Sequence, residues 1–183
     1  VGIIGPMIQP RSAPVIAGAA LAAALAACSP TLDWREFVPE GSAIAVTFPC
    51  RPDRHARPVA LGGARLRMEL LVCDAGGATY ALGFVDVADP ASIGATLADW
   101  RTTAAANIQA GTAPLAPWPL RGATPNQQAG RVTLDGRLPD GAPVREHAAF
   151  FVRGLRVYAA TVIGAQPSAA AVEIFFGGLK FPA

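Results

Sequence analysis

The chain of 183 residues is 52% hydrophobic and 15% charged, with 15 basic and 13 acidic side chains. This near balance excludes the strongly basic surface that is typical of nucleic-acid-binding proteins, so we expect no nucleic acid among its partners. After Cys28 there is no run of about 18 apolar residues, so no membrane-spanning helix is predicted there.

The first 27 residues have the pattern of an export signal. Arg11 supplies a positive charge, and residues 13–27 form an apolar, Ala-rich run that is short for a membrane span. The run ends in Leu-Ala-Ala-Cys at residues 25–28, which resembles the lipobox of bacterial lipoproteins. In that family the cysteine sulfur receives a diacylglycerol and the leader is cut just before it. The alternative is a soluble secretory signal that is cleaved near Ala27 and leaves Cys28 as an ordinary thiol.

The lipobox resemblance implies a domain organisation and a location. Residues 1–27 are expected to be the signal peptide, residues 28–40 a lipidated tether, and residues 41–183 a single periplasmic domain. Ser29 resembles the residue that follows the cysteine in lipoproteins sorted to the outer membrane of Gram-negative bacteria. We therefore expect a protein of the bacterial cell envelope that faces the periplasm, with the membrane as a partner through its N-terminal lipid.

Lipidation of Cys28 would leave Cys50 and Cys73 as an even pair in an oxidising compartment. The glycines at 62–63 predict a hairpin turn, in which the numbers of paired residues sum to 125. Cys73 then faces position 52, and Cys50 lies within diagonal reach on the same face. We expect a disulfide that contributes about 3 kcal/mol to stability.

Two other interpretations of the cysteine pair stay open. Cys50 and Cys73 could be buried free thiols, or they could form a metal or redox site with His55. Cysteines that bind metals usually come in close pairs such as C-x-x-C, which this chain lacks. The sequence therefore predicts no metal and no other cofactor.

The first half of the domain is predicted to contain strands followed by one helix. In the tether, Trp34 and Phe37 stand at helical spacing and are expected to pack against the domain. Strands are expected at residues 43–48, on both sides of the glycine turn, and at residues 78–87. From Asp89-Pro90, an N-cap and first-turn pair, to about Ala110, apolar residues recur at intervals of three and four, which predicts a helix that ends at Gly111. The expected apolar stripe is Ile93, Leu97, Trp100, Ala104 and Ile108.

The second half is predicted to form a meander and a second helix. Strands at residues 131–138 and 143–152 are joined around Asp140-Gly141, a pair typical of a type I′ turn, and a third strand covers residues 155–164. A short helix is expected at residues 168–176, stopped by two glycines. This order predicts an α+β fold, a mostly antiparallel sheet of hairpins and a meander covered by two main helices.

A second resemblance covers residues 41–182. The sequence AIAVTFP, the amphipathic helix, RVYAATVIG and AAVEIFFGGLKF together resemble uncharacterised proteobacterial lipoproteins and, more remotely, the PsbP-like fold. This resemblance implies a non-enzymatic module that binds or steadies a larger assembly. Its motifs are hydrophobic patterns without reactive groups, so it assigns no site residue.

Two regions are candidate partner-binding surfaces. Residues 111–130 form a long proline-rich connection around Trp118, either a lid or surface wrap that binds a partner or a poorly ordered excursion. Arginines cluster on the first hairpin and could meet acidic lipid headgroups, lipopolysaccharide phosphate or an anionic envelope protein, or they could be a solvated face that protects a strand edge. The cluster comprises Arg51, Arg54, Arg57, Arg65 and Arg67.

The sequence offers no catalytic constellation. His55 and His147 fall in different hairpins, and Glu146 and His147 are strand neighbours that point to opposite faces. No serine stands in a G-x-S-x-G motif. We therefore expect a non-catalytic binding or scaffold module. The alternatives are an envelope hydrolase with His147 as the base, and a carrier of a small apolar ligand, which would require a deep apolar pocket between sheet and helices.

Overall fold

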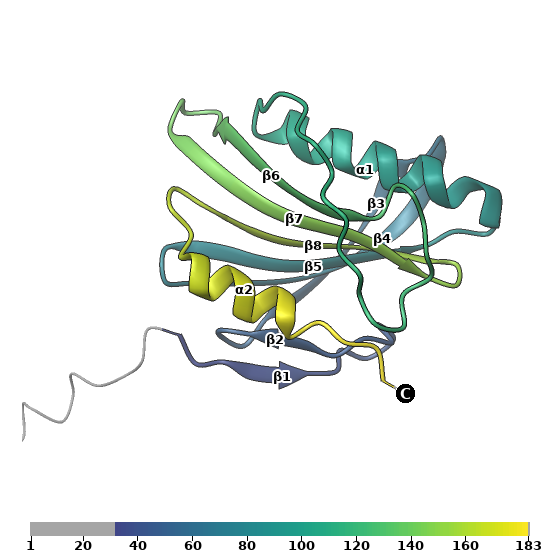
Figure 1. Cartoon of the computed structure of the whole chain (residues 1–183), viewed down its shortest axis with the longest axis horizontal. Helices are drawn as coiled ribbons and strands as arrows, with labels where there is room; N and C mark the ends of the chain where they lie inside the picture. Colours follow the sequence, from purple (N-terminus) through teal and green to yellow (C-terminus); the bar gives the residue numbers. More distant parts are fainter. Residues whose placement is uncertain (1–31, 183) are drawn as a thin grey trace, which may run out of the picture. The chain divides into compact units, whose positions relative to one another are not determined.

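The computed structural model describes residues 32–182, so the expected signal peptide, the lipidation site Cys28 and the first part of the tether lie outside the described residues. Within this range the elements, in chain order, are β1 (Arg35–Phe37), β2 (Val46–Phe48), β3 (Asp53–Leu61), β4 (Ala64–Ala75), β5 (Ala78–Asp86), α1 (Ile93–Asn107), β6 (Gly130–Arg137), β7 (Pro143–Arg153), β8 (Arg156–Gly164) and α2 (Ala169–Gly177). A 3-10 turn, Pro90–Ser92, leads into α1. Figure 1 shows how the helices and strands are arranged.

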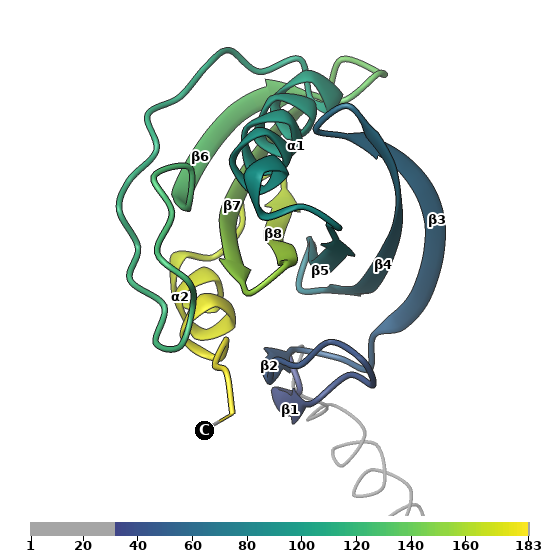
Figure 2. The same ribbon diagram turned by 90° about the vertical axis from the view of Figure 1, so that its right-hand side faces the viewer.

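A six-stranded antiparallel sheet with the strand order β3-β4-β5-β8-β7-β6 is the framework of the domain. The sheet curls around α1, which lies on its concave side (Figure 2). Helix α2 and the small sheet of β1 and β2 cover the other face. The predicted α+β fold, with a meander of β6, β7 and β8 and two covering helices, is confirmed.

The alternation of side chains along the strands creates two cores, one on each face of the sheet. The core beneath α1 is mainly aliphatic and includes Leu61, Met68, Val85, Leu97, Val132, Phe150 and Val157. The core beneath α2 is mainly aromatic and includes Phe48, Tyr80, Phe84, Phe151, Tyr158, Phe175 and Phe176. Phe151 and Tyr158 stack with their ring centroids 5.0 Å apart.

The first hairpin has the predicted register. Its pairs run from Asp53 opposite Val72 to Leu61 opposite Ala64, so paired numbers sum to 125. Gly62 and Gly63 have φ of +59° and +78°, as a tight two-residue turn requires. Cys50 and Cys73 lie at disulfide distance with Cα atoms 5.9 Å apart, consistent with the predicted bond.

The start of the domain differs from the sequence expectation. Residues 35–37 pair with β2 as a strand, so the helical spacing of Trp34 and Phe37 was the wrong interpretation. The expected packing of both side chains is confirmed: Trp34 meets Tyr80 edge-on, and Phe37 meets Phe48 in the same way. Part of the expected tether is therefore folded into the domain.

The end of α1 and the turn between β6 and β7 also differ from the prediction. Helix α1 ends at Asn107, and the chain turns at Gln109 with φ of +53°, a short distance before the expected stop at Gly111. The turn at Asp140-Gly141 is not type I′, because only Gly141 has a positive φ. Residues 138–142 form a longer loop in which the Leu138 N–H donates to the Ala142 carbonyl. No helix among residues 32–182 is long and apolar enough to cross a membrane.

Candidate functional site

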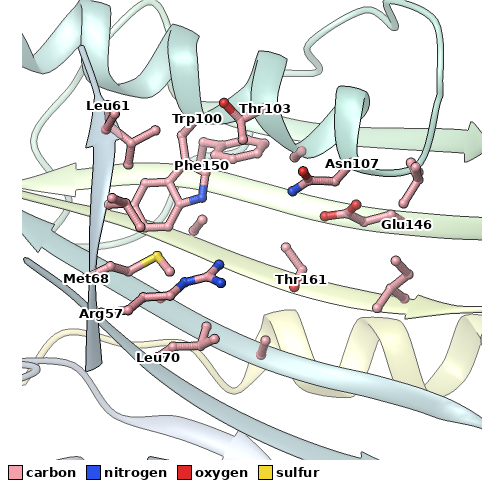
Figure 3. A pocket seen from close by; sticks show the side chains of 18 residues that line it. Arg57, Leu61, Met68, Leu70, Trp100, Thr103, Asn107, Glu146, Phe150 and Thr161 are labelled. Carbon is pink, nitrogen blue, oxygen red and sulfur yellow. The ribbon is translucent and has the colours of Figure 1, made fainter. Parts of the chain in front are cut away.

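A cavity of about 270 Å³ lies between α1 and the concave face of the sheet (Figure 3). Sites for drug-sized molecules usually enclose roughly 300 to 1,000 Å³. A cavity of about 270 Å³ lies just below this range and suits a smaller ligand. Its lining is mostly apolar and comes from α1 and from strands β3, β4, β5, β7 and β8. The principal apolar side chains are Leu61, Met68, Leu70, Trp100 and Phe150.

The cavity exists because small residues stand beneath the helix. On the two central strands, Ala81, Gly83 and Ala159 take positions where large side chains would fill the space. A methyl group added to Gly83 would lie 3.0 Å from the Trp100 ring, so the indole rests almost directly on the backbone of β5. The ring therefore lines the cavity on the side of α1.

Two hydrogen bonds attach α1 and the residue that follows it to the sheet. In the middle of the helix, the carboxylate of Asp99 accepts a hydrogen bond of 2.9 Å from the Gly62 N–H in the β3–β4 turn. After its C-terminal end, the Ile108 carbonyl accepts a hydrogen bond of 2.6 Å from the Arg137 N–H at the end of β6. The cavity is therefore a preformed feature of the fold.

Glu146 on β7 is the most unusual residue of the cavity. It is only 6% exposed, and its carboxyl forms no hydrogen bond or ion pair with any of the residues 32–182. Burial raises its pKa to about 7, because the apolar surroundings disfavour the charged form. Figure 3 shows Glu146 and Asn107 at one end of the cavity, with Arg57 farther along it.

Glu146 is missing from the residues predicted above, although the sequence of β7 carries a signal for it. Along β7 the residues at every second position face α1, and all of them except Glu146 are apolar: Val144, Ala148, Phe150 and Val152. A lone carboxylate on an otherwise apolar face is unusual enough to mark a site.

His147 lies on the opposite face of β7, as predicted, so it forms no acid–base pair with Glu146. Its Nδ1 is 3.1 Å from Thr133 Oγ1 on β6. Burial and then Arg145 lower the pKa of His147. His55 is exposed on β3, in a different part of the sheet. The two histidines and the cavity are thus separate features.

The proline-rich segment, residues 111–130, is an ordered wrap over the surface of the domain, which is one of the arrangements expected from the sequence. Ala116 bridges to Arg131 at the start of β6. Trp118 is half-buried and packs edge-on against Phe151 and Phe176, with ring centroids 5.8 Å and 6.0 Å away. Its indole is directed into the α2 core, where it stabilises the fold.

The predicted arginine cluster is divided between the two faces of the first hairpin. Arg54 and Arg67 flank Glu69, with N–O distances of 3.1 Å and 3.0 Å. The hydrogen bond from Arg54 is the main cause that lowers the pKa of Glu69. Arg57 lies on the opposite face and lines the cavity. Arg51 and Arg65 are exposed, and β3 is an edge strand of the sheet.

Residues 32–182 contain no group of three or more His, Cys, Asp or Glu side chains that could hold a metal ion. No protein-family model and no curated protein matches the chain.

Proposed function

We propose that this protein is a non-catalytic binding module held in the bacterial cell envelope by a lipid on Cys28, and that the cavity beneath α1 binds a small apolar ligand. The observation that carries the proposal is the cavity itself, an apolar space between sheet and helix. Transfer of apolar surface from water into such a space is favourable by about 25 cal/mol per Å². The fixed helix reduces the conformational cost of binding, because the site is preformed.

The charges in the cavity favour binding over catalysis. Acid–base catalysis on a bound molecule commonly uses two titratable groups with different pKa values, placed within hydrogen-bond reach of the reacting atoms. Among the described residues, Arg57 is the only charged side chain besides Glu146 that lines the cavity. His147, the base of the hydrolase alternative, faces the other side of the sheet.

Binding can be tested by isothermal titration calorimetry with the apolar probe n-octanol, which the cavity has room to enclose. We expect saturable binding to the protein produced without residues 1–27 and carrying Cys28→Ser, which cannot receive the lipid. Ala81→Phe places a ring inside the cavity and is expected to weaken probe binding at least about tenfold, since the ring occupies the ligand's space. Ala56→Phe makes the same change at an exposed position of β3 and serves as the control.

Two results would contradict the binding proposal. The probe could fail to bind in a saturable manner, or Ala81→Phe could bind it as well as Ala56→Phe while both variants keep the near-ultraviolet circular dichroism of the parent protein. The location is tested separately by mass spectrometry of the mature protein. A diacylglycerol on Cys28 is expected, and an unmodified Cys28 thiol would refute the anchor.

A further inference from the structure

We propose that Glu146 recognises a cationic amine, so that the ligand of the cavity is a small amphipathic molecule with an apolar body and one protonated amino group. This inference rests on the proposed function, because it names the chemical class of the molecule that the cavity binds. Its carrying observation is the carboxyl of Glu146, which is directed into the cavity without a protein partner (Figure 3).

Buried carboxyl groups in folded proteins are normally hydrogen-bonded, because a buried carboxyl without a partner loses its interactions with water and gains nothing in return. The fold withdraws most of the Glu146 side chain from bulk water, its carboxyl accepts no hydrogen bond from residues 32–182, and its oxygens remain accessible from the cavity. A ligand that brings N–H groups to this position can therefore reach the carboxyl and gain a hydrogen bond at a reduced desolvation cost on the protein side. Charge-assisted bonds of this kind are about twice as strong as neutral ones.

The neighbours of Glu146 suit an ammonium group, which carries three N–H donors. Asn107 on α1 and Thr161 on β8 line the same cavity and provide side-chain oxygens as further acceptors. Thr161 is diagonal to Glu146 on the sheet, since Ala148 pairs with Thr161 and Glu146 pairs with Ile163. A carboxylate or phosphate ligand would meet repulsion here, because the nearest charge at this end is negative.

The rest of the cavity accommodates an apolar body. Trp100, Phe150 and Met68 lie along it (Figure 3). The volume of about 270 Å³ limits this body to a short chain or a single ring. An aliphatic amine with a short chain has this combination of a compact charge and a small apolar part.

The affinity for an amine should depend on pH through Glu146, because few other charged groups lie near it. On the elements packed around Glu146, α1 contributes the neutral Thr103 and Asn107, β8 contributes Thr161, and Leu134 of β6 stands opposite. Arg57 on β3 is the only other charged group lining the cavity among residues 32–182. Because Glu146 must be ionised to pair with an amine, affinity for the amine should fall about tenfold per pH unit below pH 7.

The test compares n-octylamine, n-octanol and octanoate by isothermal titration calorimetry at pH 8. The protein is the mature chain carrying Cys28→Ser, whose residues 32–182 form one compact unit. We expect octylamine to bind at least about tenfold more tightly than octanol, and octanoate to bind most weakly. Glu146→Gln should remove the advantage of the amine and leave octanol binding within about threefold. Glu40→Gln, the same change at an exposed position, should alter neither.

Each outcome distinguishes the two proposals. Equal affinities of octylamine and octanol for the parent protein, or an amine preference that survives Glu146→Gln, would overturn the inference about the amine while leaving the cavity as an apolar site. Failure of all three probes to bind would overturn the proposed binding function and this inference with it. Near-ultraviolet circular dichroism of the Gln variant verifies that the cavity remains folded.

Discussion

The buried carboxyl of Glu146 should make the ligand-free protein less stable as the pH rises. Burial raises its pKa from 4.5 to about 7 in the folded state, so the folded protein holds this proton more tightly than the unfolded chain does. The resulting stabilisation is fully present below about pH 4.5 and is lost as the pH rises to about 7. At about 1.4 kcal/mol per pH unit, the full effect is about 3 kcal/mol.

Glu146→Gln removes the ionisation and keeps the shape of the side chain. Urea unfolding of the parent protein and of this variant at pH 5 and pH 8, with the disulfide intact, gives both free energies of unfolding. We expect the variant to gain about 2.5 kcal/mol relative to the parent protein between these two pH values. The difference between the proteins is the informative quantity, because it cancels groups that titrate in both.

His147 titrates in both the parent protein and Glu146→Gln, so its contribution cancels in the comparison. Its lowered pKa means that the folded state binds a proton less readily than the unfolded chain, so His147 reduces stability as the pH falls through about 6.5. The ion-paired acids Glu69, Asp135 and Glu173 have lowered pKa values and act below about pH 4.5, outside the window. Parallel pH profiles of parent protein and Glu146→Gln would refute the reasoning, since they would show that the carboxyl carries no burial cost.

Two further predictions concern the stability of the domain. Replacement of both Cys50 and Cys73 with Ala should lower the free energy of unfolding by about 3 kcal/mol, measured by urea unfolding, and reduction of the parent protein should have a similar effect; an unchanged urea midpoint would show that the cysteines are not bonded. Phe175→Ala should cost about 3 to 5 kcal/mol in the same assay, because the ring is fully buried in the α2 core. Its neighbour Ile174 is 45% exposed, and Ile174→Ala should cost well under about 1 kcal/mol; similar losses for the two would contradict the assigned face of α2.

Local patterns in the sequence were sufficient to locate the strands of the six-stranded sheet and the two helices. Paired glycines at 62–63 fix the register of the first hairpin, because a two-residue turn leaves no freedom of alignment. The spacing of apolar residues in α1 identified its buried side, and Ser168 caps α2 by accepting from the Ala171 N–H. These features depend on contacts between residues close in sequence.

The details that the sequence did not reveal depend on long-range packing. Residues 35–37 form a strand because they pair with β2. The helical spacing of Trp34 and Phe37 gives no indication of this pairing. Trp118 turns inward because Phe151 and Phe176 form an aromatic surface beneath it. The cavity arises from small residues on two strands that only the fold brings beneath α1. Glu146 is buried for the same reason, because the fold places α1 over β7.

Uptake of a small apolar molecule beneath α1 can be measured most directly by the amide chemical shifts of the mature protein during titration with n-octanol. We expect saturable shifts concentrated on α1 and on the cavity-lining parts of β4, β5 and β8, and we expect Ala81→Phe to suppress them. Shifts that do not saturate, or that gather around α2 and the outer face of the sheet, would contradict a binding site in the cavity.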